Sequence, residues 1–202
     1  ESMAELAHFL YQQRSKDIHL AARLSRLAEP NLLQMLSKKA ASAEAEEVVE
    51  LAGRVEDLFQ NLARPQSLAH ATRIREAAAA RLGAWSHARF VSESAAADRF
   101  YEQGDLRNAL ATAEKVYRQC LAAGDAAYPG AAYDAALAHW RLGKMLQRSG
   151  NPEPALQLTE EARRRFLVLA AAGNTDAEGM ASACLTQMGD CYKAAGRFDE
   201  AA

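Results

Sequence analysis

Histidine is the residue of this chain best suited to bind a metal ion or transfer a proton, and its spacing favours neither role. The five histidines are scattered along the sequence. They are His8, His19, His70, His87 and His139. No two of them have the His-x-x-x-His spacing that places two imidazoles on one side of a helix around a metal ion. We therefore expect no metal site, no cofactor and no catalytic residue, so the chain is not predicted to be an enzyme.

The three cysteines also lack a spacing that would indicate chemistry. Cys184 and Cys191 are seven residues apart, so on one helix they would lie two turns apart and could not form a disulfide. Cys120 stands alone, and there is no Cys-x-x-Cys pair. We expect all three to be small buried apolar residues in a reducing compartment, which favours a cytoplasmic protein.

Three basic residues have the spacing of a binding surface. Arg141, Lys144 and Arg148 are three and four positions apart, so on a helix they share one face, which we call the basic ridge. Trp140 lies beside them and could supply a flat apolar contact or a cation–π partner. One hypothesis is that the ridge binds an acidic peptide by charge-assisted hydrogen bonds. The alternative is that nearby acidic residues neutralise it.

A second basic run has a different interpretation. Arg163, Arg164 and Arg165 are consecutive, so on a helix they spread over about 200° and cannot form one stripe. Glu160 and Glu161 lie close by in the sequence. This run therefore indicates a solvated outer surface rather than a phosphate-binding patch.

The composition indicates closely packed helices. Half of the 202 residues are apolar but only 7% are aromatic, and alanine is abundant, which favours helices that approach one another closely. The formal net charge of −2 gives no general reason to expect nucleic acid or a membrane surface as a partner. No uncharged apolar stretch approaches the about 20 residues of a membrane-spanning helix.

A turn signal recurs at a fixed interval and organises the second half of the chain. Gly104, Gly150 and Gly196 are 46 residues apart (150 − 104 and 196 − 150), and an alanine follows each of them five positions later. The glycine is expected to end a first helix in a left-handed conformation. An acceptor side chain near the start of the second helix is expected to cap it. The candidates for this role are Asp105, Asn151 and Asp199. Such a period predicts stacked helix pairs, each covering the apolar side of the next.

The first ninety residues are also predicted to be helical. We expect a helix in the first segment, a second that ends at Pro30, and a short third helix capped by Asn31. Next, apolar residues at helical spacing predict a longer helix, and Pro65 is expected to begin another. The apolar stripe consists of Val48, Leu51, Val55, Leu58 and Leu62. No Ser-, Gly- or Pro-rich linker follows, so this part is expected to continue directly into the repeats.

The repeating segments resemble tetratricopeptide repeats. In "HWRLGKMLQRSGNPEPALQLTEEA" and "LTQMGDCYKAAGRFDEAA", the pairs Leu142-Gly143 and Met188-Gly189 stand at the family's Leu-Gly. Leu146 and Tyr192 stand at its tyrosine, and Ala155 and Ala201 at its small residue. The 46-residue step exceeds the family's usual step of about 34. Longer units of this kind resemble those of large bacterial signalling proteins and kinesin-light-chain-like adaptors.

The resemblance implies a place for the binding residues. In tetratricopeptide folds the first helices of successive units line a concave face that binds peptides. The residues implied for this face are Ser94, Asp98, Tyr101, Trp140, Arg141, Lys144, Arg148, Thr186, Gln187, Asp190 and Lys193. Asp98 and Asp190 would flank the basic ridge and could neutralise it by salt bridges between repeats. The family's carboxylate clamp uses asparagines that these first helices lack, so we do not expect capture of chaperone tails.

These observations combine into one prediction. We expect an all-α, right-handed α-solenoid of antiparallel helix pairs, with divergent pairs over 1–89 and repeats over about 90–135, 136–181 and 182–202. The predicted function is protein–protein interaction or scaffolding, with a protein or peptide as partner. The alternative is a regulatory sensor that binds a small ligand or signal peptide and controls an effector domain elsewhere. The divergent helices resemble those of bacterial signal-transduction ATPases, although the chain has no G-x-x-x-x-G-K-[ST] phosphate loop. We expect a larger parent protein and a homodimer through an open edge at Ala202.

Overall fold

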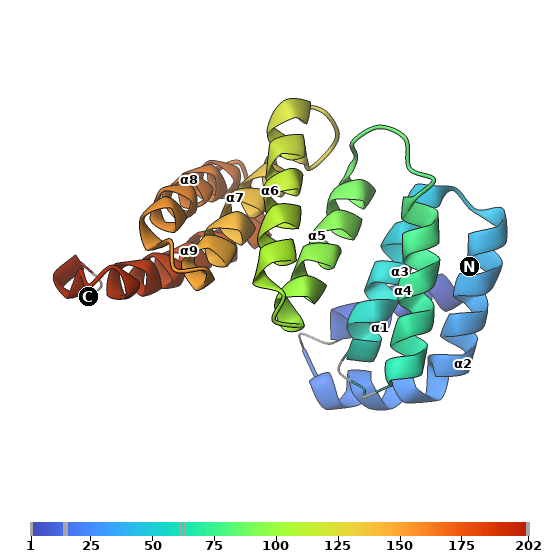
Figure 1. The fold of residues 1–202 in the computed structure, drawn as a ribbon. Coiled ribbons are helices and arrows are strands. Elements are labelled where there is room, and N and C mark those ends of the chain that lie inside the picture. Colours follow the sequence, from blue (N-terminus) through green and yellow to red (C-terminus); the bar gives the residue numbers. More distant parts are fainter. Residues whose placement is uncertain (1, 14–15, 61, 63, 201–202) are drawn as a thin grey trace. The chain divides into compact units, whose positions relative to one another are not determined.

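The computed structural model of the chain describes residues 2–13, 16–60, 62 and 64–200. These residues form nine α-helices and one short 3-10 helix, and they include no strand, which confirms the predicted all-α class. The chain divides into two compact units, residues 1–84 (unit 1) and 85–202 (unit 2). Each unit is described by itself below (Figure 1).

Unit 1 contains four helices packed around an aliphatic core. They are α1 (Ser2–Gln13), α2 (Ile18–Ser42), α3 (Ala45–Gln60) and α4 (Pro65–Ala79). The apolar stripe predicted between Val48 and Leu62 is buried along its whole length. It packs against Leu10, Leu32 and Leu36 from α1 and α2. The core also holds an ion pair, because buried Arg75 of α4 donates through Nε to both carboxylate oxygens of Glu56 on α3, at 3.0 and 2.9 Å.

The predicted helix end at Pro30 is wrong. Helix α2 runs through Pro30 and Asn31, so that Asn31 caps nothing, and it ends only at Ser42. Proline costs a helix one hydrogen bond and a clash one turn earlier, which a bend relieves. Figure 1 shows α2 changing direction along its length. Burial of Ala28, Leu32 and Leu36 on either side of the proline holds the chain helical in spite of this cost.

Unit 2 is built from helix pairs. Its helices are α5 (His87–Glu102), α6 (Leu106–Ala123), α7 (Ala131–Arg148), α8 (Pro152–Ala171) and α9 (Thr175–Ala194), followed by a 3-10 turn at Phe198–Glu200. Each helix packs on the next along the chain. In addition, α5 contacts α7 and α7 contacts α9, whereas within the described residues α6 and α8 do not pack on each other. The first helices therefore lie on one common side of the unit.

The recurring glycines end the first helices as predicted. Gly104, Gly150 and Gly196 have φ of 78°, 79° and 74°, in the left-handed region that glycine adopts without strain. In each turn the following amide donates to the carbonyl oxygen five positions back, as Asn151 does to Leu146 at 3.0 Å. This is the Schellman arrangement, which satisfies carbonyl groups at a helix end.

The predicted caps are confirmed for one position of three. Asp105 accepts from the Asn108 amide at 3.1 Å. Asn151 makes no such bond, because its side-chain amide donates backwards to the Ser149 carbonyl oxygen at 3.1 Å. Asp199 lies inside the 3-10 turn and begins no helix of the described residues. Helix α8 instead begins with Pro152, whose missing amide hydrogen costs nothing at that position.

Gly143 marks the closest approach between α7 and α8. A Cβ atom added there would lie 2.8 Å from Thr159 Oγ1 and 3.1 Å from the Ala155 carbonyl oxygen, both on α8. It would also lie 3.0 Å from Nε2 of Gln187, on α9. A side chain of any size would push these helices apart, so the glycine of the Leu-Gly pair has a steric role.

Candidate partner-binding face

The candidate site is the side of unit 2 formed by the first helices α5, α7 and α9. The basic ridge lies on α7, the middle helix of the three. The helices on either side supply the other residues predicted for this face.

Arg141 is neutralised by its neighbour on α5. Its guanidinium Nη1 donates to Oδ2 of Asp98 and forms an ion pair with it. The Arg141 side chain is 28% exposed and that of Asp98 is 45% exposed, so water still reaches the pair. The expectation that an aspartate of a flanking repeat would neutralise part of the ridge is therefore correct for Asp98.

Lys144 keeps its charge available and lies between two aromatic rings. Its Nζ is 5.5 Å from the centre of the Tyr101 ring and 5.6 Å from the centre of the Trp140 ring. Both distances are within the range of cation–π attraction. The rings hold the ammonium group in place without removing its positive charge.

Three further charged side chains of this face are open to solvent. Arg148, in the last turn of α7, and Asp190 and Lys193, on α9, are all exposed. Within the described part of the chain, none of the three forms a hydrogen bond or ion pair through its side chain. Asp190 therefore does not neutralise the ridge, in contrast to Asp98.

Gln187 faces the interior of unit 2. Its side chain is 7% exposed, and its Nε2 donates to Thr159 Oγ1 at 2.9 Å and to the Trp140 carbonyl oxygen at 3.3 Å. One amide group thus joins α9 to both α7 and α8. Gln187 is not available to a partner, and it is left out of the site proposed below. Ser94 is buried too, whereas Thr186 is exposed.

The interior beneath the face leaves little empty space. A cavity of about 10 Å³ lies between α5, α6 and α7. Its lining residues are Ser94, Ala97, Asp98, Ala113, Val116, Ala138, Arg141 and Met145. This volume is about that of one water molecule by the same measure, so the cavity is too small for a metabolite.

A polar cluster that the sequence analysis missed joins α5, α7 and the loop before α7. The buried carboxylate of Asp134 accepts from His87 Nδ1 at 2.8 Å and from the Tyr128 hydroxyl at 2.9 Å. Burial, followed by the charge of Asp134, raises the pKa of Tyr128 and raises that of the nearby Cys120 thiol to about 12. Such a thiol is not a nucleophile near neutral pH. His87 and Asp134 are 47 positions apart, so no local spacing could have indicated this contact.

The remaining cysteines and His139 are structural. All three cysteines are free and buried, and burial raises the pKa of Cys184 and of Cys191 to about 11. The Nδ1 atom of His139 donates to the Ala135 carbonyl oxygen of its own helix at 2.7 Å. Its ring packs edge-on against Tyr117, and burial lowers its pKa. Among the described residues no three His, Cys, Asp or Glu side chains are placed to hold a metal ion.

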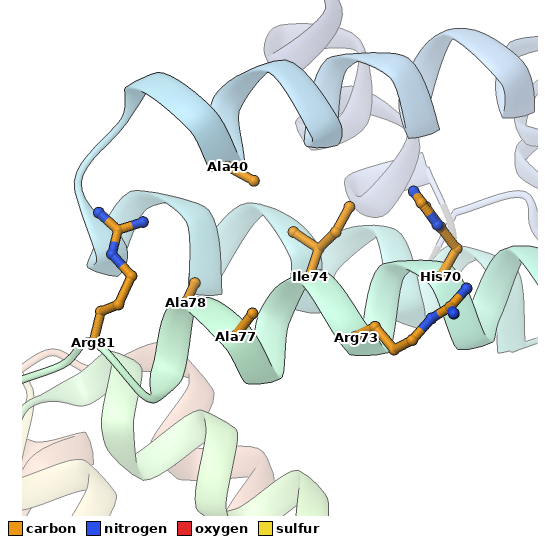
Figure 2. Close-up of a pocket in the computed structure, with 7 residues that line it drawn as sticks. All are labelled: Ala40, His70, Arg73, Ile74, Ala77, Ala78 and Arg81. Carbon is orange, nitrogen blue, oxygen red and sulfur yellow. The ribbon is translucent and has the colours of Figure 1, made fainter.

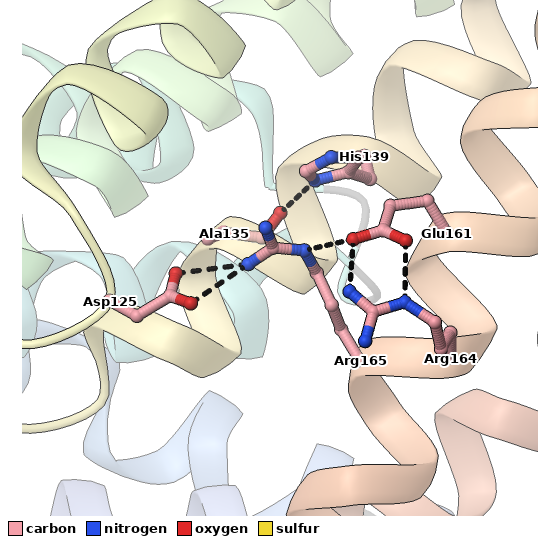
Figure 3. A network of polar contacts seen from close by, with 6 residues as sticks. All are labelled: Asp125, Ala135, His139, Glu161, Arg164 and Arg165. Carbon is pink, nitrogen blue, oxygen red and sulfur yellow. Dashed lines mark hydrogen bonds and ion pairs between the residues drawn. The ribbon is translucent and has the colours of Figure 1, made fainter.

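The arginine run on α8 forms a surface network (Figure 3). Glu161 accepts from Arg164 and Arg165, and Arg165 also donates to both carboxylate oxygens of Asp125 in the loop after α6. The hydrogen bond from Arg164, followed by that from Arg165, lowers the pKa of Glu161 to about 2. The prediction of a solvated outer surface holds for Arg164, which is exposed, whereas Arg163 and Arg165 are half-buried. Through Arg165 the network ties α8 to the loop after α6.

Comparison with known proteins identifies the fold. No family model matches the chain, and no curated protein matches it. Among solved structures, TPR-like repeats assigned to a kinesin light chain of Podosopora anserina superpose with a TM-score of 0.62 and 18% identity. That match covers 99% of this chain and 88% of the other. BtubC (BKLC) of P. vanneervenii superposes with a TM-score of 0.54 and 16% identity, over 90% of this chain and 87% of the other.

These identities are low enough that the likeness establishes the fold and nothing more. The fold is a TPR-like α-solenoid, as the repeat pattern predicted. Solenoids of this type present an extended surface for other proteins and typically carry no catalytic machinery. In the described part of the chain, none of the helices has the length and apolar character that crossing a bilayer requires.

Proposed function

We propose that this TPR-like chain is a protein–protein interaction module whose α5–α7–α9 face binds a short acidic peptide segment of a partner. Lys144 and Arg148 are its anchors, and Tyr101 and Trp140 supply the adjoining apolar surface. Arg141 has a supporting role, because Asp98 already occupies its guanidinium.

The position of Lys144 carries this proposal. A lysine on an exposed helix usually loses side-chain entropy when it binds an anion. Here two aromatic rings already restrain the ammonium group, so less freedom remains to be lost on binding. Arg148 lies one helical turn further on and adds a second positively charged donor. Its guanidinium has no hydrogen-bonding or ionic partner among the described residues.

The proposal is tested with a fluorescein-labelled synthetic peptide that carries three consecutive glutamates flanked by serines. Fluorescence anisotropy measures its Kd for the natural chain and for Lys144→Glu and Arg148→Glu. Each reversal replaces an attraction with a repulsion, so we expect Kd to rise at least about fivefold.

Arg107→Glu is the matched control. It makes the same charge change at an exposed arginine of α6, away from the face, and should leave Kd within about twofold. Equal binding by Lys144→Glu, Arg148→Glu and the natural chain would reject the proposed site. Equal weakening by Arg107→Glu would show that only net charge matters.

The broader setting remains a prediction from the sequence. It includes a cytoplasmic location, a role in a bacterial signalling protein, a homodimer, and no role for nucleic acid. A sensor for a small ligand is the alternative, and the cavity of about 10 Å³ beneath the face is too small to be its binding site. Light scattering would test the dimer, and binding of the acidic peptide would favour interaction over small-ligand sensing.

A further inference from the structure

Helix α4 presents an uncovered face in unit 1 (Figure 2). His70, Arg73, Ile74 and Ala77 lie on one side of α4, and Arg81 follows in the turn just after α4 ends at Ala79. Across from them, Ala40 of α2 forms part of the facing wall. The space between them is an open groove of about 570 Å³ that lies wholly within unit 1. We call it the α2–α4 groove.

The floor of the groove is apolar and lined mainly by short side chains. Ala40, Ala77 and Ala78 end at Cβ, so no long side chain fills the space, and Ile74 is the largest apolar residue there. At one end Ser37 Oγ of α2 lies 3.3 Å from His70 Nε2 of α4 and links the two walls. Small residues on facing helices let a third helix approach closely.

The groove also has a defined charge. Arg73 and Arg81 are exposed, and within the described residues neither side chain has an ionic or hydrogen-bonding partner. They are eight positions apart in the chain, Arg73 on α4 and Arg81 in the turn that follows its last residue, Ala79. No acidic side chain is among the residues that line the groove. A partner with carboxylates of matching separation would therefore find two unoccupied guanidinium groups.

We propose that the α2–α4 groove binds an acidic amphipathic helix of another protein. Two acidic residues about two turns apart pair with Arg73 and Arg81, and an apolar residue midway between them packs on Ile74 and Ala77. This is helix-in-groove recognition, in which apolar contact supplies affinity and the flanking ion pairs fix the register. The groove belongs to unit 1 and the α5–α7–α9 face to unit 2, so this proposal does not rest on the proposed function.

The probe for this site is a fluorescein-labelled, alanine-rich helical peptide with glutamates eight positions apart and a leucine midway. Its Kd for the full chain is measured by fluorescence anisotropy. We expect Arg73→Glu and Arg81→Glu each to raise Kd at least about fivefold. Ala77→Trp, which fills the groove without changing charge, should weaken binding to a similar extent. A peptide with glutamines in place of the glutamates should also bind at least about fivefold more weakly.

Two controls separate this site from general charge attraction and from the other face. Arg23→Glu reverses an exposed charge elsewhere on α2 and should leave Kd within about twofold. Lys144→Glu should also leave it unchanged, because that residue belongs to unit 2. Circular dichroism confirms that each variant is folded. The proposal is overturned if the natural chain does not bind the peptide, if Arg73→Glu and Arg81→Glu bind it normally, or if either control weakens binding equally.

Discussion

At Gly143 the missing side chain sets the distance between two helices and permits a buried polar contact. The Thr159 hydroxyl donates to the Ala155 carbonyl oxygen at 2.7 Å and accepts from Gln187. These atoms occupy the space that a Cβ at Gly143 would enter. Close packing and hydrogen bonding therefore depend on the same glycine.

We predict that Gly143→Ala destabilises the protein. The added methyl group would meet backbone and a buried polar pair rather than a flexible side chain, which costs about 1–3 kcal/mol. The gain in helix propensity, about 0.5–1 kcal/mol, offsets only part of this cost. Urea denaturation followed by circular dichroism measures the difference.

Gly179→Ala in α9 is the matched control. An added Cβ there meets nothing within 4 Å, so only the gain in helix propensity remains. We expect this variant to be as stable as the natural chain or slightly more stable. If Gly143→Ala behaved in the same way, the steric role of Gly143 would be refuted.

At the scale of helices, the sequence predicted helix ends that depend on the local backbone. It did not predict those that depend on packing against other helices. Gly104 and Gly150 end helices because of their own backbone freedom, so their spacing sufficed to locate these turns. Pro30 follows an equally local rule, yet burial of Leu32 and Leu36 overrides it. That burial depends on other helices, so a local pattern could not reveal it.

Helix α8 offers a prediction about pH. Glu161 has its pKa lowered to about 2 from an ordinary 4.5, so its network stabilises the folded state fully above about pH 4.5. The stabilisation is lost as pH falls from 4.5 toward 2. Over this range the Glu161 carboxylate takes up a proton in the unfolded state but stays ionised in the folded state, so acid favours unfolding. Glu161→Gln should lower Tm at pH 7 by about 2–4 °C, equivalent to about 1 kcal/mol.

The difference in Tm between the natural chain and Glu161→Gln should shrink as pH falls through this window. Glu160→Gln serves as the control, because Glu160 is exposed and makes no side-chain ion pair within the described residues. A difference for Glu161→Gln that stayed constant down to pH 3 would contradict the role of its ionised carboxylate.

At the scale of the whole molecule, two units fold around separate apolar cores. The prediction that they form one continuous array has a direct test, because both tryptophans, Trp85 and Trp140, lie in unit 2. Tryptophan fluorescence reports on unit 2 alone, whereas circular dichroism reports on both units. If the array is continuous, we expect the two signals to follow one urea transition.

Val55→Ala strengthens that test. Val55 is fully buried in unit 1, and its truncation should cost about 2 kcal/mol there. In a continuous array the tryptophan transition of unit 2 should move with it. An unchanged tryptophan transition would show that the units unfold independently.

The sequence predicted the helix pairs of unit 2 and several residues of the candidate face. It did not predict which of these side chains already have a partner within the chain. Asp98 and Asp190 occupy equivalent positions, yet of these two only Asp98 forms an ion pair with an arginine of the described residues. Gln187 falls on the predicted face by spacing, and its side chain turns inward because Thr159 of another helix offers a partner. The α2–α4 groove was missed because it arises from small residues on two helices that are not adjacent in sequence.

The 46-residue step has a consequence for which segments the α5–α7–α9 face would accept. Asp98, Lys144 and Asp190 occupy corresponding positions, so the sign of the charge alternates from one helix to the next. Neighbouring helices are about 10 Å apart, which an extended peptide spans in about three residues. Beyond the middle helix a long polyacidic tail would meet the carboxylate of Asp190 as well as Lys193, whereas a brief acidic run would end before it reached that carboxylate. The alternating charges thus limit how many acidic residues a bound peptide can carry in a row. They also disfavour a peptide position shifted along the face by one helix.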